Sequence, residues 1–231
     1  MKPVRLYLIL TALIGMTLIS CGQPKDPLPQ IHKDIKAKGV DTYSIVLSDM
    51  QTEGNFIKTY SHSYRVITPE QKFSYGPLGV PKKMFDYYKP YLGMTIWSQK
   101  DGEGGQNLAP PGYAYVGDPR YGQWRTDSSG RSFWMFYGQY RLLSDLLGLG
   151  GRVYRGPYDR YRQYRSQNRP YYGPNQNYGT NGTITRRQYP DFFQRQQSRA
   201  RATGTSFSNK VNQRIGRTRT VTRGRSFFGG K

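Results

Sequence analysis

Two stretches of alternating hydrophobic and polar residues lie in the first third of the chain. In the first, Tyr43, Ile45 and Leu47 alternate with more polar residues, and in residues 56–67 aromatic or aliphatic residues again recur at every other position. A glycine-containing segment, residues 52–55, separates the two stretches. This period of two is typical of β-strands, and two such runs around a turn predict an antiparallel hairpin. Because a lone hairpin is only marginally stable, other elements must cover it.

Further elements are predicted downstream of the hairpin. Residues 81–88 have a proline near their start and predict a short helix that ends before Pro90. Residues 94–97 are largely apolar and predict a third strand. Residues 101–130 are rich in Gly, Pro and Tyr. That segment is too long for an ordinary connection, which predicts either a functional loop or a partly disordered one.

The longest apolar run of the mature chain, residues 132–147, predicts a second helix. Ser132 is placed to be its N-cap, and glycines that follow the run are placed to end it. Packed on the hairpin, this helix would complete a small α+β domain over residues 41–151. If it is exposed instead, helix 133–149 would dock the chain into a surface or envelope assembly as a structural subunit.

The N-terminal residues carry the most specific signal in the sequence. Lys2 and Arg5 precede an apolar stretch, residues 6–19, that is too short to cross a bilayer comfortably as a helix. A cationic start followed by a short apolar stretch is typical of a secretory signal peptide. The stretch runs into Leu18-Ile19-Ser20-Cys21, which contains the one cysteine of the chain. An ordinary secretory leader and a retained membrane anchor are the alternatives.

The segment Leu18-Ile19-Ser20-Cys21 resembles the lipobox of bacterial lipoproteins. The resemblance implies that residues 1–20 are a signal peptide, removed before Cys21. It also implies that the Cys21 thiol receives a diacylglyceryl group and that the new amino group is acylated, with palmitate for example. By the same resemblance, Gly22 in place of Asp favours the outer membrane over the inner one. The polar, proline-containing residues 21–40 then indicate a tether between lipid and domain.

Charge divides the chain of 231 residues, whose formal net charge is +21. Residues 22–151 contain 15 Lys and Arg against 12 Asp and Glu, whereas residues 152–231 contain 18 against 2. The latter segment has no Leu, Met or Trp and five Val or Ile. Burial of so small an aliphatic area would compensate only a small part of the conformational entropy lost on folding. The composition therefore predicts a disordered cationic tail over residues 152–231.

Arginine and tyrosine alternate at short intervals in this predicted tail. Guanidinium groups bind phosphates and carboxylates in forked pairs, and tyrosine rings stack on flat ligands. The pattern predicts a site for anionic envelope polymers: lipopolysaccharide, acidic polysaccharide or extracellular nucleic acid. A partner protein complex, self-association through the tail and a plain solvated spacer are the alternatives. The arginines predicted to bind are Arg155, Arg160, Arg162, Arg165, Arg217, Arg219, Arg223 and Arg225, with Tyr161 and Tyr164 as stacking groups.

Little in the sequence indicates catalysis. One Cys and two His rule out a disulfide framework and a Cys/His metal site, and we expect no cofactor. His62 lies between serines that point to the opposite face of the strand, which indicates a packed or solvent-facing residue. His32 lies in the predicted tether and is expected to be exposed. The alternative to a non-enzymatic role is a periplasmic hydrolase with its site in loop 101–130.

A second resemblance concerns the order of segments. The lipobox, the aromatic Ser132–Met135 segment and the Arg/Ser/Gly-rich terminus with Val221-Thr222-Arg223-Gly224 are similar to uncharacterised Gram-negative envelope lipoproteins. This resemblance implies an envelope location. The sequence therefore predicts a non-enzymatic, membrane-anchored lipoprotein that acts as a scaffold or tether.

Overall fold

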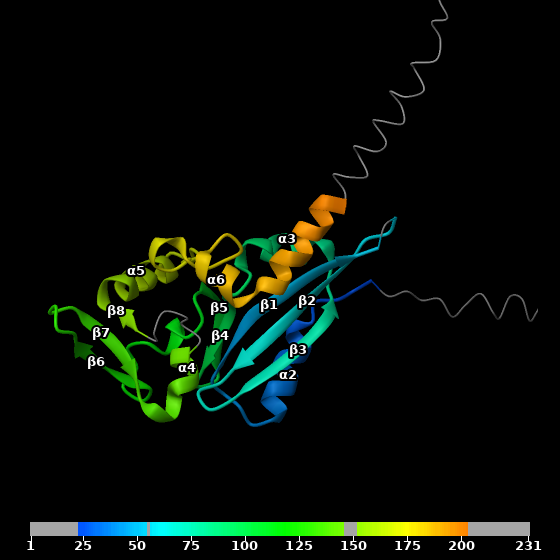
Figure 1. Cartoon of the computed structure of the whole chain (residues 1–231). Helices are drawn as coiled ribbons and strands as arrows, with labels where there is room; N and C mark the ends of the chain where they lie inside the picture. Colours follow the sequence, from blue (N-terminus) through cyan, green and yellow to red (C-terminus); the bar gives the residue numbers. More distant parts are fainter. Residues whose placement is uncertain (1–22, 55, 146–151, 203–231) are drawn as a thin grey trace, which may run out of the picture.

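An antiparallel sheet of five strands forms the centre of the protein (Figure 1). The structure is a computed structural model that describes residues 23–54, 56–145 and 152–202. The strand order is β3-β2-β1-β4-β5, and the bounds are β1 (Tyr43–Glu53), β2 (Thr59–Ile67), β3 (Lys72–Gly79), β4 (Thr95–Lys100) and β5 (Glu103–Ala109). Ile45 pairs with Val66 and Leu47 with Tyr64, so the predicted hairpin is confirmed. The predicted third strand is β4.

A smaller antiparallel sheet follows, in the order β6-β7-β8. Its strands are β6 (Gly122–Thr126), β7 (Ser132–Phe136) and β8 (Val153–Tyr154). The predicted helix over residues 132–147, and with it the docking helix 133–149, is wrong. Bulky aromatic residues favour a strand, and a non-helical break at Tyr137 separates β7 from a short helix, α4 (Arg141–Asp145). Residues 146–151 lie outside the described residues.

Helices cover both sheets, and the fold class is α+β as predicted. The short predicted helix is confirmed as α3, which begins after Pro81. The α-helices are α2 (Leu28–Ala37), α3 (Lys82–Tyr88), α4, α5 (Arg155–Ser166) and α6 (Thr183–Gln188), followed by helical residues 190–202. Short 3-10 turns are η1 (Lys89–Tyr91), η2 (Tyr113–Tyr115), η3 (Gly138–Tyr140) and η4 (Pro174–Gln176).

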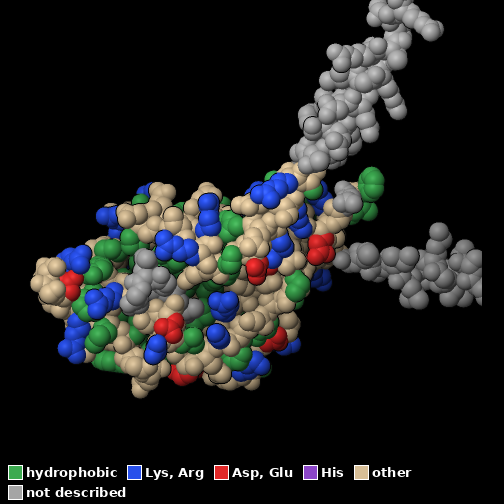
Figure 2. Space-filling view, in the orientation of Figure 1, with side chains coloured by type: hydrophobic (Ala, Val, Ile, Leu, Met, Phe, Trp, Pro, Cys, Tyr) green, Lys and Arg blue, Asp and Glu red, His purple; other side chains and the backbone are tan. Residues whose placement is uncertain are grey.

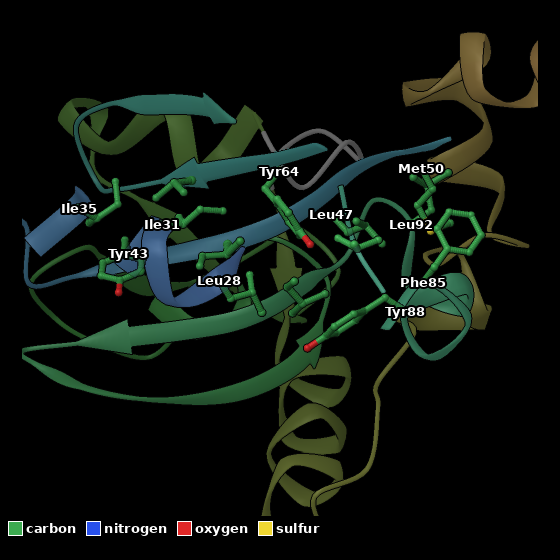
Figure 3. Close-up of a cluster of buried hydrophobic side chains, with 14 of the residues drawn as sticks. Leu28, Ile31, Ile35, Tyr43, Leu47, Met50, Tyr64, Phe85, Tyr88 and Leu92 are labelled. Carbon is green, nitrogen blue, oxygen red and sulfur yellow. The ribbon is translucent and has the colours of Figure 1, made fainter. Parts of the chain in front are cut away.

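Helix α2 corrects the prediction of a tether over residues 21–40. Leu28, Ile31 and Ile35 recur at helical spacing and form one apolar face, while the lysines between them stay in solvent. This face packs on the large sheet and closes a hydrophobic core against Leu47 and Tyr64 (Figure 3). The helical spacing of three apolar residues is a short pattern among charged residues. The polar composition of the segment therefore suggested a tether instead of a helix.

A second core lies on the other face of the large sheet and consists mainly of aromatic rings. Val46 and Ile67 meet Tyr113, Tyr115 and Trp134 there. The hydroxyl of Tyr115 donates a hydrogen bond of 3.2 Å to the Ile67 carbonyl oxygen, which satisfies the phenol inside the core. Residues 101–130 therefore are not a loop: they contain β5, η2 and β6, and their tyrosines are core residues.

Part of the predicted disordered tail is also folded. Residues 152–202 contribute β8, α5, α6 and helical residues 190–202, and they bury Tyr161, Tyr171, Ile184 and Phe192. Each buried aromatic ring removes a large area from water. A segment poor in leucine can therefore still compensate the conformational entropy that it loses on folding. The prediction of disorder is wrong for residues 152–202. Residues 203–231 lie outside the described residues.

His62 is fully buried beneath α3. Its ring stacks on Phe85 with 5.4 Å between centroids, and its Nδ1 lies 3.0 Å from the Tyr64 hydroxyl oxygen. Burial lowers the pKa of His62 to about 4 from its ordinary value of 6.5, because the charged ring would lose its hydration. The prediction of a packed strand residue is confirmed. His32, by contrast, is half-buried, with Nδ1 2.7 Å from the Tyr43 hydroxyl oxygen, which corrects its expected exposure.

We expect His62 to make the fold sensitive to acid. The His62 ring takes up a proton near pH 6.5 in the unfolded chain and near pH 4 in the folded chain. The free energy of unfolding therefore keeps its full value above pH 6.5 and decreases as the pH falls toward 4. The loss amounts to about 3 kcal/mol. Urea denaturation of the parent and of His62→Gln between pH 7 and pH 4 measures it: the variant should lose less stability over this range. Parallel pH profiles would contradict the assignment.

Candidate polyanion-binding face

Helix α5 separates its tyrosines from its arginines. Tyr158, Tyr161 and Tyr164 are three positions apart and therefore lie along one side of the helix. Tyr161 is buried in the second core, and its neighbours Tyr158 and Tyr164 are half-buried. The arginines between them face solvent. The alternation that resembled a disordered tail is thus the pattern of an amphipathic helix with an aromatic buried side.

Arg160, Arg162 and Arg165 are all exposed residues of α5, and all three were predicted to bind. Arg162 and Arg165 line one open hollow, whereas Arg160, two residues before Arg162, projects from the other flank of Tyr161. In the described part of the chain no carboxylate pairs with Arg160 or Arg162. Their guanidinium groups are therefore available to anions in solution. In the space-filling view, Lys and Arg side chains outnumber acidic ones on the visible face (Figure 2).

Arg165 is held in place by a buried polar network. Its Nη1 donates to the Tyr161 hydroxyl oxygen at 3.1 Å, and Asn107 Nδ2 lies 3.2 Å from that same oxygen. Asn107 is itself buried and also donates to the Ser98 hydroxyl at 3.0 Å. Because Asn107 and Ser98 belong to strands β5 and β4, the large sheet sets the position of an arginine on α5.

Three open hollows meet at Arg165. One of ≈ 520 Å³ includes Lys100 in its lining, a second of ≈ 430 Å³ includes Arg162, and a third of ≈ 80 Å³ includes Arg169. Arg165 and another cation thus line each hollow. Asp101 and Glu103 also line the first, whereas the second and third have no acidic residue in their lining. Such an arrangement suits anionic groups spaced along a polymer better than one deeply enclosed small molecule. We call the exposed arginines that flank the buried Tyr161, namely Arg160, Arg162, Arg165 and Arg169, the arginine face.

Arg155 is already engaged by its neighbours. Its Nε lies 3.2 Å from Asp159 Oδ1, and its guanidinium carbon lies 4.7 Å from the centroid of the Trp124 ring. It closes the end of α5 against the small sheet. We therefore leave Arg155 out of the arginine face, although the sequence predicted it as a binding residue.

The two predicted stacking groups are corrected. Tyr161 is 3 % exposed and contacts Tyr113 and Tyr171, so its ring cannot meet a ligand. Tyr164 packs edge-on against Tyr171, and Arg169 lies over it at 4.9 Å from the ring centroid. Both rings support the arginines instead of binding beside them. Four predicted arginines and the predicted lipid site lie outside the described residues: Arg217, Arg219, Arg223, Arg225 and Cys21.

One member of this face, Arg169, and two residues beside it, Lys100 and Asn107, were not predicted as site residues. Arg169 follows α5 at near-helical spacing from Arg165, so the same periodicity that reveals the helix could have found it. Lys100 and Asn107 come from the large sheet. No sequence signal links them to α5, because only the packing of distant segments brings them together.

Carboxylates in the region predicted as a hydrolase loop serve as ion-pair partners. Arg120 forms a forked pair with Asp101, at 2.9 and 2.8 Å, and also contacts Asp118 at 2.8 Å. Lys100 pairs with Asp118 as well. The Arg120 hydrogen bonds, followed by those from Lys100, hold the pKa of Asp118 well below its usual range. A general acid for hydrolysis needs a raised pKa, so these groups give the hydrolase alternative no support.

The described residues contain neither a metal site nor a membrane-spanning helix. No group of three or more His, Cys, Asp or Glu side chains is arranged there to hold a metal ion. Across residues 23–54, 56–145 and 152–202, no helix combines the length and the apolar character that crossing a bilayer requires.

Comparison with known proteins supplies no relative. No protein-family model matches the chain, and neither the curated proteins nor the solved structures include a significant match.

Replacement of Asp118 by Asn should destabilise the fold by about 1 kcal/mol at pH 7, since it removes the charge that Arg120 and Lys100 share. The carboxylate contributes stability above about pH 4 and loses it as the pH falls through its depressed pKa. Urea denaturation at pH 7 and pH 3 should therefore show the difference shrinking in acid. An equal difference at both values would show that the charge is not responsible.

Proposed function

We propose that this chain is a non-enzymatic envelope lipoprotein that holds an anionic polymer close to the membrane. The observation that carries the proposal is the arginine face: exposed guanidinium groups on α5 and just after it, of which Arg160 and Arg162 have no carboxylate partner within the described residues. The ligand class is a polymer with repeated phosphate, sulfate or carboxylate groups. Lipopolysaccharide, acidic polysaccharide and extracellular nucleic acid all have this chemistry.

Binding would rest on many weak charge-assisted contacts. Each arginine can hold an oxyanion in a forked pair, and each contact releases counterions from the polymer. The hollows around Arg165 give room for substituents of the polymer between the cations. The arginines between residues 217 and 225 would add contacts along the same ligand. A membrane anchor raises the effective concentration, so weak individual contacts are enough.

The anchor follows from the leader sequence. A lipid-modified Cys21 would carry two or three acyl chains, and each buried methylene contributes about 0.8 kcal/mol, so the attachment is stable in practice. The residue after the cysteine is Gly22, which favours the outer membrane as the destination. The protein would then present its arginine face to polymers of the envelope.

The arginine face is tested by the variant Arg160→Gln/Arg162→Gln on immobilised heparin. A deletion from residue 152 onward would remove buried Tyr161 and Tyr171 and so unfold the second core, whereas these two exposed side chains can be changed without loss of packing. We expect elution at lower salt than the parent. In a binding titration the slope of log affinity against log salt should fall by about one for each lost contact.

The matched control is Lys33→Gln/Lys36→Gln on α2, which removes the same number of charges from another exposed surface. This control should elute close to the parent. Equal shifts in the two variants would mean that net charge alone governs retention, and that α5 is not a binding face.

Lipid attachment is tested by mass spectrometry of the full chain expressed with its leader in a Gram-negative host. We expect an N-terminal peptide that begins at Cys21 and carries diacylglyceryl and acyl groups. The Cys21→Ser variant should keep its leader and lack the lipid, because no thiol is present to accept it. An unmodified Cys21 in the processed parent would contradict the lipoprotein assignment.

A further inference from the structure

The connection between β1 and β2 exposes two large apolar side chains. Phe56 is fully exposed and Ile57 is 83 % exposed, and they are the most exposed large hydrophobic residues of the described chain. The hairpin extends beyond the rest of the sheet, and its apolar end projects into solvent (Figures 1 and 2). Residues of this kind are costly to leave in water, so their position at a projecting tip indicates a contact that covers them.

The tip lies at the same end of the sheet as Pro24, close to the start of the described chain. Pro24 packs against Gly79, where an added Cβ would lie 3.5 Å from the proline ring, and Gly79 pairs with Ser61 on β2. Ser61 is a few residues from the tip along the same strand. Three residues of extended chain span at most about 11 Å, so a lipid on Cys21 must lie close to this end of the domain.

Basic side chains line a groove next to the base of the tip. A groove of ≈ 1240 Å³ runs between the hairpin, α3 and helical residues 190–202, and its lining includes Lys58, Lys89, Arg186 and Arg199. Glu53 is the single acidic residue in that lining. An apolar tip with a basic surround matches the two layers of an anionic membrane surface, in which headgroups lie above the acyl chains.

We propose that the β1–β2 tip inserts Phe56 and Ile57 into the surface of the anionic membrane that holds Cys21, while the basic groove contacts the headgroups. The proposal builds on the lipid anchor of the proposed function. Two side chains form too small a patch for a stable protein interface, whereas they suffice as a second attachment beside a lipid. In Figure 1 the tip and α5 lie at opposite ends of the molecule, so this contact would turn the arginine face away from the bilayer.

The test uses the mature chain without lipid, residues 22–231, which contains every described residue. Its binding to vesicles of phosphatidylethanolamine and phosphatidylglycerol is measured by sedimentation at low salt and at about 0.5 M salt, where charge attraction is screened. We expect Phe56→Ser/Ile57→Ser to weaken the salt-resistant binding by about tenfold or more. The control Met135→Ser/Tyr137→Ser removes two other exposed apolar side chains and should bind like the parent.

A second measurement follows the tip directly. The mature chain from Gly22 contains no cysteine, so Ile57→Cys can be labelled alone with an environment-sensitive dye. We expect a blue shift of its emission on adding the vesicles and no shift for the control label at Tyr137→Cys. If both labels stay unchanged and the serine variants bind equally, the membrane proposal is overturned.

The two proposals fail separately. An unmodified Cys21 together with a blue-shifted tip would remove the lipid anchor and keep the tip as a membrane contact. A lipidated Cys21 together with an unshifted tip would keep the anchor and overturn the tip contact.

Discussion

Strand β1 is buried on both of its faces, and the rest of the fold follows from the need to cover them. It is the central strand of the large sheet, with Ile45 and Leu47 in one core and Val46 in the other. Burying one such side chain contributes about 1.5–3 kcal/mol, so neither face can be left to water. Helix α2 and α3 cover the first face. The second face is covered by η2, the small sheet and α5. The arginine-rich helix α5 is thereby part of the folded domain.

The sequence predicted those parts of the fold in which a local pattern decides the outcome. The β1–β2 hairpin and α3 follow from alternation and from Pro81, and both are confirmed. Residues 132–136 were misread because an apolar aromatic run has no period that separates strand from helix, and its pairing with β6 decides. Helix α2 was missed because its three apolar residues are surrounded by charge.

The second core was missed for a different reason. Residues 152–231 contain no Leu, Met or Trp and five Val or Ile, which suggested a segment without enough apolar area to fold. Tyrosine does not enter that aliphatic count, yet Tyr115 and Tyr161 each bury a large ring, and their hydroxyls bond to the Ile67 carbonyl and the Asn107 amide. Of the candidate site, the identity of Arg160, Arg162 and Arg165 was predicted from composition. Their support by Asn107 depends on long-range packing that no local pattern encodes.

The rigidity of α5 has a consequence for selectivity. In a helix each residue advances about 1.5 Å, so α5 fixes the backbone spacing of Arg160, Arg162 and Arg165, and the hydrogen bond to Tyr161 also holds the Arg165 guanidinium. A preorganised array loses little entropy on binding, but it fits best those polymers whose own charges repeat at matching distances. A flexible arginine-rich chain adapts to almost any anion. If the arginine face binds a polymer as proposed, arginines folded onto a tyrosine core would exchange that tolerance for discrimination by charge spacing.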